Sequence, residues 1–273
     1  MTEKLRDPRW LWILFLICII IPLVRPIGLP MGVSGNTVKV YEAIKSVTSG
    51  SLVFLSPDYA LENRGELQAM LVATLKCLLQ KDVKIVSAGF YGTTSPMLMD
   101  EAMKKVGLEN YGKKYGEDFV NLGYLPGGEA TIAALGVDVH SIVKVDFYNK
   151  PISEIPLMDH FRSAEDIDLV ISIAAGNEYP DKWIRQWQVK YGTKITGGAV
   201  AMIYPMMVSY VASGQLKGYL DSSRGAAEFE LLTKNPGEAI ITMDAQSLGH
   251  IVAVVAIVIC NLSYVISKKE GRA

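Results

Sequence analysis

The chain has 273 residues, of which 27 are Lys or Arg and 28 are Asp or Glu, giving a net charge of -1. With 50% hydrophobic residues and a mean hydropathy of +0.24, the composition excludes a disordered chain and indicates that part of the protein lies in a membrane. The balanced charge argues against nucleic acid as a partner, because nucleic-acid binding needs a strongly basic surface.

The first apolar segment covers residues 10–24 and follows the basic residues Lys4, Arg6 and Arg9. It is typical of a signal anchor or of a cleaved secretory signal. The residues that follow it lack a small-x-small cleavage site, which favours a retained anchor. Because the segment reaches only about 22 Å at ~1.5 Å per residue, we extend the predicted transmembrane helix over residues 10–27, after a tail at residues 1–9.

The second apolar segment, residues 248–266, has no Asp, Glu, Lys or Arg and is followed by Lys268, Lys269 and Arg272. This segment is the stronger prediction of a transmembrane helix. Basic residues flank both spans at the chain ends, so the positive-inside rule predicts a two-pass protein of the cell membrane. Both tails, residues 1–9 and 267–273, are then cytoplasmic, and the central domain is extracytoplasmic.

Small residues recur in the second span at Gly249, Ala253 and Ala256, at spacings of four and three that place them on one helix face. Such a stripe allows another helix to approach closely. The first span, a membrane-protein partner or a second copy of the chain are the candidate neighbours. An alternative is that the stripe has no role, because Gly and Ala are common in membrane helices.

Between the spans we predict a single α/β domain at residues 33–234 and a polar tether at residues 235–247. Six apolar runs have the length of strands: residues 51–56, 83–90, 119–125, 169–175, 194–202 and 216–221. Most are continuously apolar, which is typical of parallel strands covered on both faces.

Helical patterns lie between these runs, at residues 62–80, 100–106, 130–135, 180–190, 204–212 and 225–233. The alternation predicts a doubly wound, mostly parallel Rossmann-like sheet flanked by helices, with one transmembrane helix at each end of the chain. Residues 142–168 do not fit the alternation and are expected to form an inserted loop or an edge hairpin.

Polar and glycine-rich turns follow the predicted strands, at the edge where parallel α/β sheets bind ligands. The candidate ligand-binding residues are Asp58, Tyr91, Gly92, Thr93, Thr94, Ser95, Gly127, Gly128, Glu129, Asn177, Ser222, Ser223 and Arg224. Thr94 or Ser95 can cap a helix that has Pro96 in its first turn, and the free N–H groups there suit an anion. The alternative is that such residues only start a helix. Arg224 can likewise clamp an anion or only pair with Glu228 four residues later.

Several chemistries find no support in the sequence. The glycine-rich turns match neither the dinucleotide-binding nor the P-loop pattern, so no nucleotide cofactor is expected. His140, His160 and His250 have no ligand-spaced partners, so no metal is expected. A Ser nucleophile elbow is missing, and Cys77 lies on the apolar side of a predicted helix, as a packing residue does.

Three functional interpretations remain open. The first is a non-catalytic, membrane-anchored binding or assembly module that recognises a small anionic ligand or a protein partner at the loops after the strands. The second is an extracytoplasmic hydrolase or transferase at the same edge, which requires Asp58, Glu129 and Arg224 to share one cleft. The third is a purely structural subunit of a membrane complex.

Overall fold

The structure is a computed structural model that describes residues 8–176 and 180–269. The chain divides into two compact units. Gly32–Gly237 forms the first, and Met1–Met31 together with Glu238–Ala273 forms the second.

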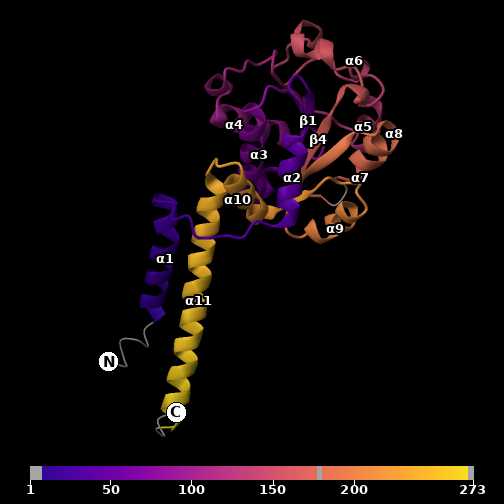
Figure 1. Ribbon diagram of the computed structural model, residues 1–273. Helices are drawn as coiled ribbons and strands as arrows, with labels where there is room; N and C mark the ends of the chain where they lie inside the picture. The colour runs from indigo at the N-terminus through magenta and orange to yellow at the C-terminus, as the bar shows by residue number, and fades with distance from the viewer. Residues whose placement is uncertain (1–7, 177–179, 270–273) are drawn as a thin grey trace. The chain divides into compact units, whose positions relative to one another are not determined.

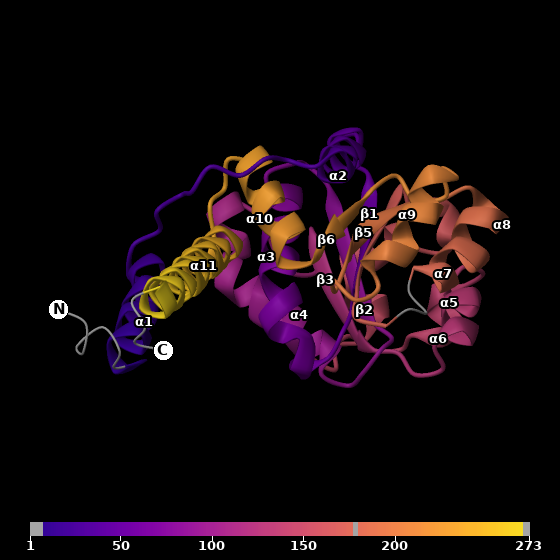
Figure 2. The ribbon, with the colours of Figure 1, turned by 90° about the horizontal axis from the view of Figure 1, so that it is seen from below.

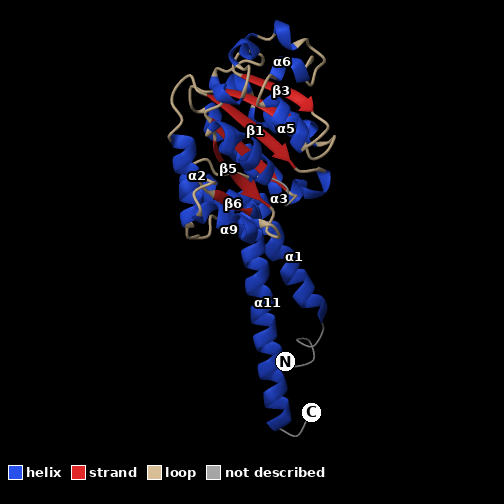
Figure 3. Cartoon of the chain, turned by 90° about the vertical axis from the view of Figure 1, so that its right-hand side faces the viewer, coloured by secondary structure: helices blue, strands red, loops and turns tan. Residues whose placement is uncertain are grey.

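The larger unit is built on a six-stranded parallel sheet in the order β3-β2-β1-β4-β5-β6 (Figure 3). The strands are β1 (Leu52–Asp58), β2 (Lys84–Gly89), β3 (Phe119–Tyr124), β4 (Leu169–Ala174), β5 (Lys194–Ala199) and β6 (Tyr219–Asp221). Each coincides with one of the predicted apolar runs. The predicted α/β class with a parallel Rossmann-like sheet is therefore confirmed, and every neighbouring pair of strands is parallel.

Helices cover both faces of the sheet (Figure 2). One face carries α3 (Arg64–Leu79), α4 (Ser95–Val106) and α10 (Ser222–Leu232). The other carries α5 (Glu129–Leu135), α7 (Asp181–Trp183), the π-helical turn η7 (Ile184–Gln188), α8 (Val189–Tyr191) and α9 (Tyr204–Ala212). The chain changes face after β3, so the direction in which strands are added reverses between β1 and β4.

The helix α2 (Gly35–Lys45) was not among the predicted helices. Its β-branched residues Thr37, Val38 and Val40 have low helix propensity. Tertiary contacts outweigh that propensity: Ser34 caps the helix, and the Thr37 hydroxyl donates a 2.7 Å hydrogen bond to Glu228 of α10. This helix is therefore stabilised by contacts in the folded domain rather than by its local sequence.

Residues 142–168, which break the alternation of strands and helices, fold as short turns rather than as a regular element. They begin at the end of α6 (Val139–Ile142) and contain η4 (Ile152–Glu154), η5 (Pro156–His160) and η6 (Ala164–Asp166), with an antiparallel bridge between Val145 and Pro151. Two further single turns, η2 (Leu61–Asn63) and η3 (Leu108–Tyr111), precede α3 and follow α4.

The second unit consists of α1 (Pro8–Val24) and α11 (Glu238–Lys269), which pack antiparallel along each other (Figure 1). Of the described helices, only α11 is long and apolar enough to cross a membrane, over Glu238–Ile266. The prediction of a spanning helix at each end is thus only partly supported. With 17 residues, α1 reaches about 25 Å, and it ends before the expected Ile27 because Pro26 disfavours helical backbone at Arg25.

Two details of this unit differ from the sequence expectation. The residues expected as a tether, 235–247, are helical from Glu238 onward. In the small-residue stripe, Gly249 is buried against α1, where a side chain would come within 3.4 Å of the Phe15 ring, whereas Ala253 is exposed. The basic residues Lys4, Arg6 and Arg272, on which the predicted orientation partly depends, lie outside the described residues.

A buried carboxylate holds the chain that follows α1. Asp244 of α11 is 2% exposed. It accepts hydrogen bonds from three consecutive backbone N–H groups, those of Ile27, Gly28 and Leu29, at 2.7 to 2.9 Å. The two carboxyl oxygens of this one side chain satisfy all three N–H groups. This acid therefore fixes the turn after α1 within the helical unit.

Candidate functional site

The strand order places one candidate residue at the point where the sheet changes direction. In parallel α/β sheets, ligands bind in the crevice outside the carboxyl ends of the strands at this point. Here these strands are β1 and β4, whose last residues, Asp58 and Ala174, are paired in the sheet. Asp58 is thus the member of the predicted set that lies directly at the switch point.

Asp58 is fully buried, and its carboxylate accepts hydrogen bonds from three side chains. The hydroxyl of Ser56 donates at 2.9 Å, that of Ser172 at 3.0 Å and the indole N–H of Trp183 at 3.3 Å. We refer to Ser56, Asp58, Ser172 and Trp183 as the Asp58 cluster. Because its members come from β1, β4 and α7, the cluster ties both strands of the switch point to the helical layer above them.

Burial dominates the electrostatics of this cluster. It raises the pKa of Asp58 from 3.8 to about 6, although the hydrogen bonds that the carboxylate accepts work in the opposite direction. A carboxyl group with such a pKa can hold a proton under mildly acidic conditions. Asp58 can therefore gain or lose a charge close to the switch point.

Tyr219 extends the polar region across the sheet. Its hydroxyl donates a 3.4 Å hydrogen bond to the carbonyl oxygen of Ser172, two strands away. Gly197 of β5 lies between the two residues and is paired with both. Since Gly197 has no side chain, the Tyr219 ring has room to cross β5, and a Cβ there would collide with the Ser172 carbonyl.

Aromatic rings pack beside the Asp58 cluster. Phe54 lies 5.1 Å from Trp183 and 5.5 Å from Trp187, measured between ring centroids, and the two indoles meet edge to face at 4.9 Å. Both indole N–H groups are satisfied, since Trp187 donates to the carbonyl of Ile132 at 2.8 Å. These buried rings exclude water from the side of the switch point that faces α7 and η7.

The loop after β2 reaches the switch point from the neighbouring strand. Tyr91 is 42% exposed, and its ring lies close enough to Gly176, just after β4, that a Cβ there would come within 3.0 Å. Ser95 donates a 2.6 Å hydrogen bond to the carbonyl of Tyr59. Thr94 precedes α4 without capping it, and its buried hydroxyl has no hydrogen-bond partner among the described residues.

The other residues of this loop contribute backbone rather than side-chain contacts. Gly92 lies near Ala60, and Thr93 is exposed. The glycines after β3, Gly127 and Gly128, both have positive φ and form the tight turn into α5. Glycine adopts such positive φ values readily because it has no Cβ.

Glu129 is held by an ion pair. Arg185 donates two hydrogen bonds to its carboxylate, each 2.9 Å long, and Gln186 donates a third at 2.7 Å. The Arg185 bonds contribute most to lowering the pKa of Glu129 to about 2. Glu129 is therefore a charged hydrogen-bond acceptor that links α5 to η7.

The start of α10, directly after β6, is tied to the start of α3. Ser222 has a left-handed backbone, with φ of 52°, and its hydroxyl donates to Glu66 at 2.5 Å, while the Ser223 hydroxyl lies 3.4 Å from the Glu66 carbonyl. Glu66 also accepts the backbone N–H of Ala201, after β5, at 2.7 Å. Arg224 pairs with Glu228 one turn along α10, at 3.0 Å.

Asp58, Glu129 and Arg224 are each held by a different set of partners, and Asn177 lies outside the described residues. Sequence reasoning missed Ser56, Ser172, Trp183, Tyr219 and Glu66. The usable signal was the pair of serines, because each interrupts an otherwise apolar strand.

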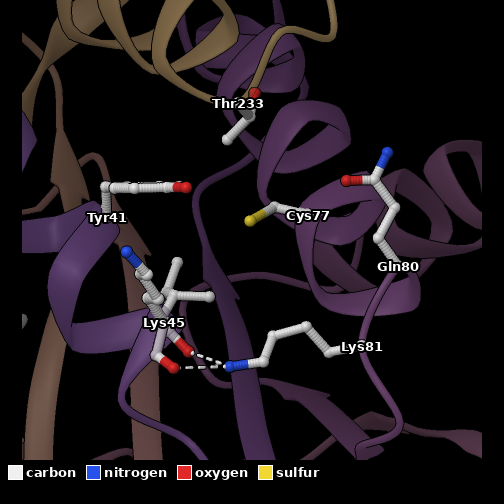
Figure 4. Close-up of a pocket in the computed structure, with 7 residues that line it drawn as sticks. Tyr41, Lys45, Cys77, Gln80, Lys81 and Thr233 are labelled. Atoms are coloured by element: carbon white, nitrogen blue, oxygen red, sulfur yellow. Dashed lines mark hydrogen bonds between the residues drawn. The ribbon is translucent and has the colours of Figure 1, made fainter.

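A hollow of 230 Å³ lies elsewhere, between the carboxyl ends of α2 and α3 and so at the amino ends of the strands (Figure 4). Lys81 points across it and donates to the carbonyls of Ile44 and Lys45, both at 2.8 Å, which satisfies the end of α2. Burial raises the pKa of the Cys77 thiol to about 11. Cys77 is thus a protonated packing residue.

No group of three His, Cys, Asp or Glu side chains among residues 8–176 and 180–269 is arranged to hold a metal ion. Comparison with models of protein families gives no match, and comparison with curated proteins gives no significant match. The function of the protein is therefore inferred from the geometry of its fold.

Proposed function

We propose that the protein is a membrane-anchored, non-catalytic α/β binding module whose ligand site is the crevice at the carboxyl ends of β1 and β4. The observation that carries this proposal is the reversal of strand order between these strands. Beside it, Tyr91 is partly exposed and Thr94 has a buried hydroxyl without a partner among the described residues.

A small anionic ligand is the occupant that this surrounding favours. The Thr94 hydroxyl, which has no partner among the described residues, is a hydrogen-bond donor just before the first turn of α4, and a helix N-terminus attracts negative charge. Protonation of Asp58, whose pKa is raised to about 6 by burial, would lower the repulsion between the ligand and this carboxyl group.

Membrane anchoring is supported by the exposed side chains of the helical unit. On α11, Ile251, Val254 and Ile257 are all more than half exposed, and on α1 the same is true of Trp10 and Trp12. So large an exposed apolar surface needs lipid around it. We propose that both helices sit in the bilayer, with both chain ends cytoplasmic and the α/β unit extracytoplasmic.

Catalysis at the same edge has less support. The hydrolase or transferase interpretation needs Asp58, Glu129 and Arg224 in one cleft, but Asp58 is buried under Trp183, and the other two residues pair with Arg185 and Glu228. A binding role requires no such convergence.

The test is a thermal-shift screen of the full chain in detergent against inorganic phosphate, nucleotides, sugar phosphates and carboxylates. A ligand at 100 times its Kd adds about 2.7 kcal/mol to the free energy of unfolding, which raises the Tm by several degrees. We expect Thr94→Val to abolish the shift and Thr233→Val, at the opposite edge of the sheet, to preserve it. An equal shift in both variants, or none with any anion in the folded wild type, would contradict the proposal.

A protein partner at the same edge is the second candidate, because apolar side chains are exposed shortly after two of its strands. Leu61, after β1, is 60% exposed, and Met97, after β2, is 59% exposed. Exposed methionines are common at adaptable binding surfaces. Photocrosslinking from position 97 in native membranes tests it, with position 137 as the control: a discrete adduct at 97 alone favours this candidate, and equal labelling excludes it.

A further inference from the structure

The outer surface of α9 carries no charge. Residues 200–216, which contain this helix, include no Asp, Glu, Lys or Arg. Met207 and Val211 point into the core. The outward residues, called the α9 face below, are Met202, Pro205, Met206, Val208, Ser209 and Ala212.

The α9 face is unusually apolar for a surface in water. Met202 is 82% exposed, and Met206 and Val208 are about half exposed, at 49% and 47%. Single exposed apolar residues are ordinary, but a contiguous patch along a helix marks a surface that something covers. The flexible methionine side chains suit an uneven, fluid neighbour.

The position of α9 in the chain indicates what that neighbour is. α9 lies beside the start of α2, where the Asn36 side chain donates a 2.7 Å hydrogen bond to the Tyr204 hydroxyl. Only residues 25–33 separate the end of α1 from Ser34, the cap of α2. Nine residues span at most about 30 Å, so the chain itself limits how far the start of α2 can lie from the end of α1.

Exposed lysines flank α9 in the chain and on the neighbouring helix α2. Lys39 lies one turn beyond Asn36 on α2, and Lys217 follows α9 by five residues. Both are exposed, and both line a hollow of 350 Å³ that also contains Lys194 and a single acid, Glu42. An apolar helix face with lysines at its border is the pattern of helices that lie in the headgroup layer of an anionic membrane. Facing another copy of itself, the same border would bring like charges together.

We propose that the α9 face is a second membrane contact, which rests in the headgroup layer of the bilayer that holds the helical anchor. This inference depends on the proposed anchoring and adds a fixed orientation of the α/β unit against the lipid surface. The unit is then attached through covalent anchors and also docked through α9.

The experiment uses the full chain with Cys18→Ala and Cys260→Ala, leaving the buried Cys77, and one added cysteine that carries an environment-sensitive fluorophore. The added cysteines are Met206→Cys on the α9 face, Val255→Cys on the exposed side of α11 and Val137→Cys, whose side chain is 71% exposed on the loop after α5. Each protein is reconstituted in vesicles of phosphatidylcholine and phosphatidylglycerol that contain a lipid-borne quencher.

We expect a blue shift and quenching at positions 206 and 255 but not at 137. Introducing Met202→Lys and Val208→Lys together should abolish the effect at 206 and leave 255 unchanged. Quenching at 255 alone would overturn the α9 contact while leaving the anchor in place, and no quenching at 255 would refute the anchor itself. Shielding of position 206 in detergent, accompanied by crosslinked dimers, would assign the face to a second copy and overturn the proposal.

Discussion

The two faces of the sheet are packed with different chemistry. Toward α3, aliphatic side chains such as Leu71 fill the layer, and the buried Gln68 makes neutral hydrogen bonds to Tyr59 and to the Leu98 carbonyl. Toward α7, aromatic rings surround an ionisable group, Asp58. The packing around Leu71 responds to changes in volume, whereas the packing around Asp58 responds to volume and to charge, and it is the latter that leads to the switch point.

The largest expected effect comes from removing the ring at the centre of the aromatic face. Phe54→Ala should lower the free energy of unfolding by about 4 kcal/mol, because it leaves a cavity beside both indoles. Leu71→Ala, the matched change on the other face, should cost about 3 kcal/mol. Urea unfolding in detergent measures both values.

Tryptophan fluorescence separates the two variants. Phe54→Ala should shift the native emission, because Trp183 and Trp187 lose a packed neighbour, while Leu71→Ala should leave it unchanged. A cost below about 1 kcal/mol for Phe54→Ala would mean that the aromatic face is not a cohesive core.

The next effect is electrostatic and belongs to Asp58. The folded protein holds the Asp58 proton more tightly than the unfolded chain does, because burial raises the pKa from 3.8 to about 6. The resulting stabilisation is complete below the lower value and is lost as the pH rises through the upper one. This group alone should therefore remove about 3 kcal/mol of stability between about pH 4 and about pH 7.

Asp58→Asn should flatten this dependence and make the protein relatively more stable at neutral pH. Urea unfolding across the same pH range measures it, and Asp159→Asn, an exposed acid, serves as the control. If Asp58→Asn kept the wild-type pH profile, the Asp58 cluster would not be the ionisable part of this face.

The smallest expected effect tests whether the polar region around Asp58 extends to Tyr219. Tyr219→Phe removes a hydroxyl whose 3.4 Å bond to the Ser172 carbonyl is long, so the expected cost is about 0.5 kcal/mol. Because Ser172 also belongs to the Asp58 cluster, a double-mutant cycle with Asp58→Asn should show coupling. Strict additivity would show that Tyr219 and Asp58 act independently.

Much of the larger unit follows from the sequence because its signals are local. The six strands are continuous apolar runs, and α9 was placed at its observed bounds, Tyr204–Ala212. By contrast, α2 was missed because β-branched residues conceal it and Glu228 stabilises it from far along the chain.

The site was less predictable than the fold, for a physical reason. Asp58 was identified because it follows an apolar run, but strand order decides which strand ends meet, and this depends on where the chain changes face. Burial raises its pKa, and the side chains whose hydrogen bonds oppose this effect come from residues 56, 172 and 183. No spacing along the chain reports that convergence or the pairing of Glu129 with Arg185, whereas the pairing of Arg224 with Glu228 was one of the two sequence interpretations.

The bonds from residues 27–29 to Asp244 also bear on when the chain can be processed. A peptidase binds its substrate as an extended strand with free backbone groups, and proteolysis concentrates at exposed, unbonded loops. Once the helical unit has folded, the N–H groups of Ile27, Gly28 and Leu29 are already taken. Folding of the helical unit therefore protects the turn after α1 from proteolysis.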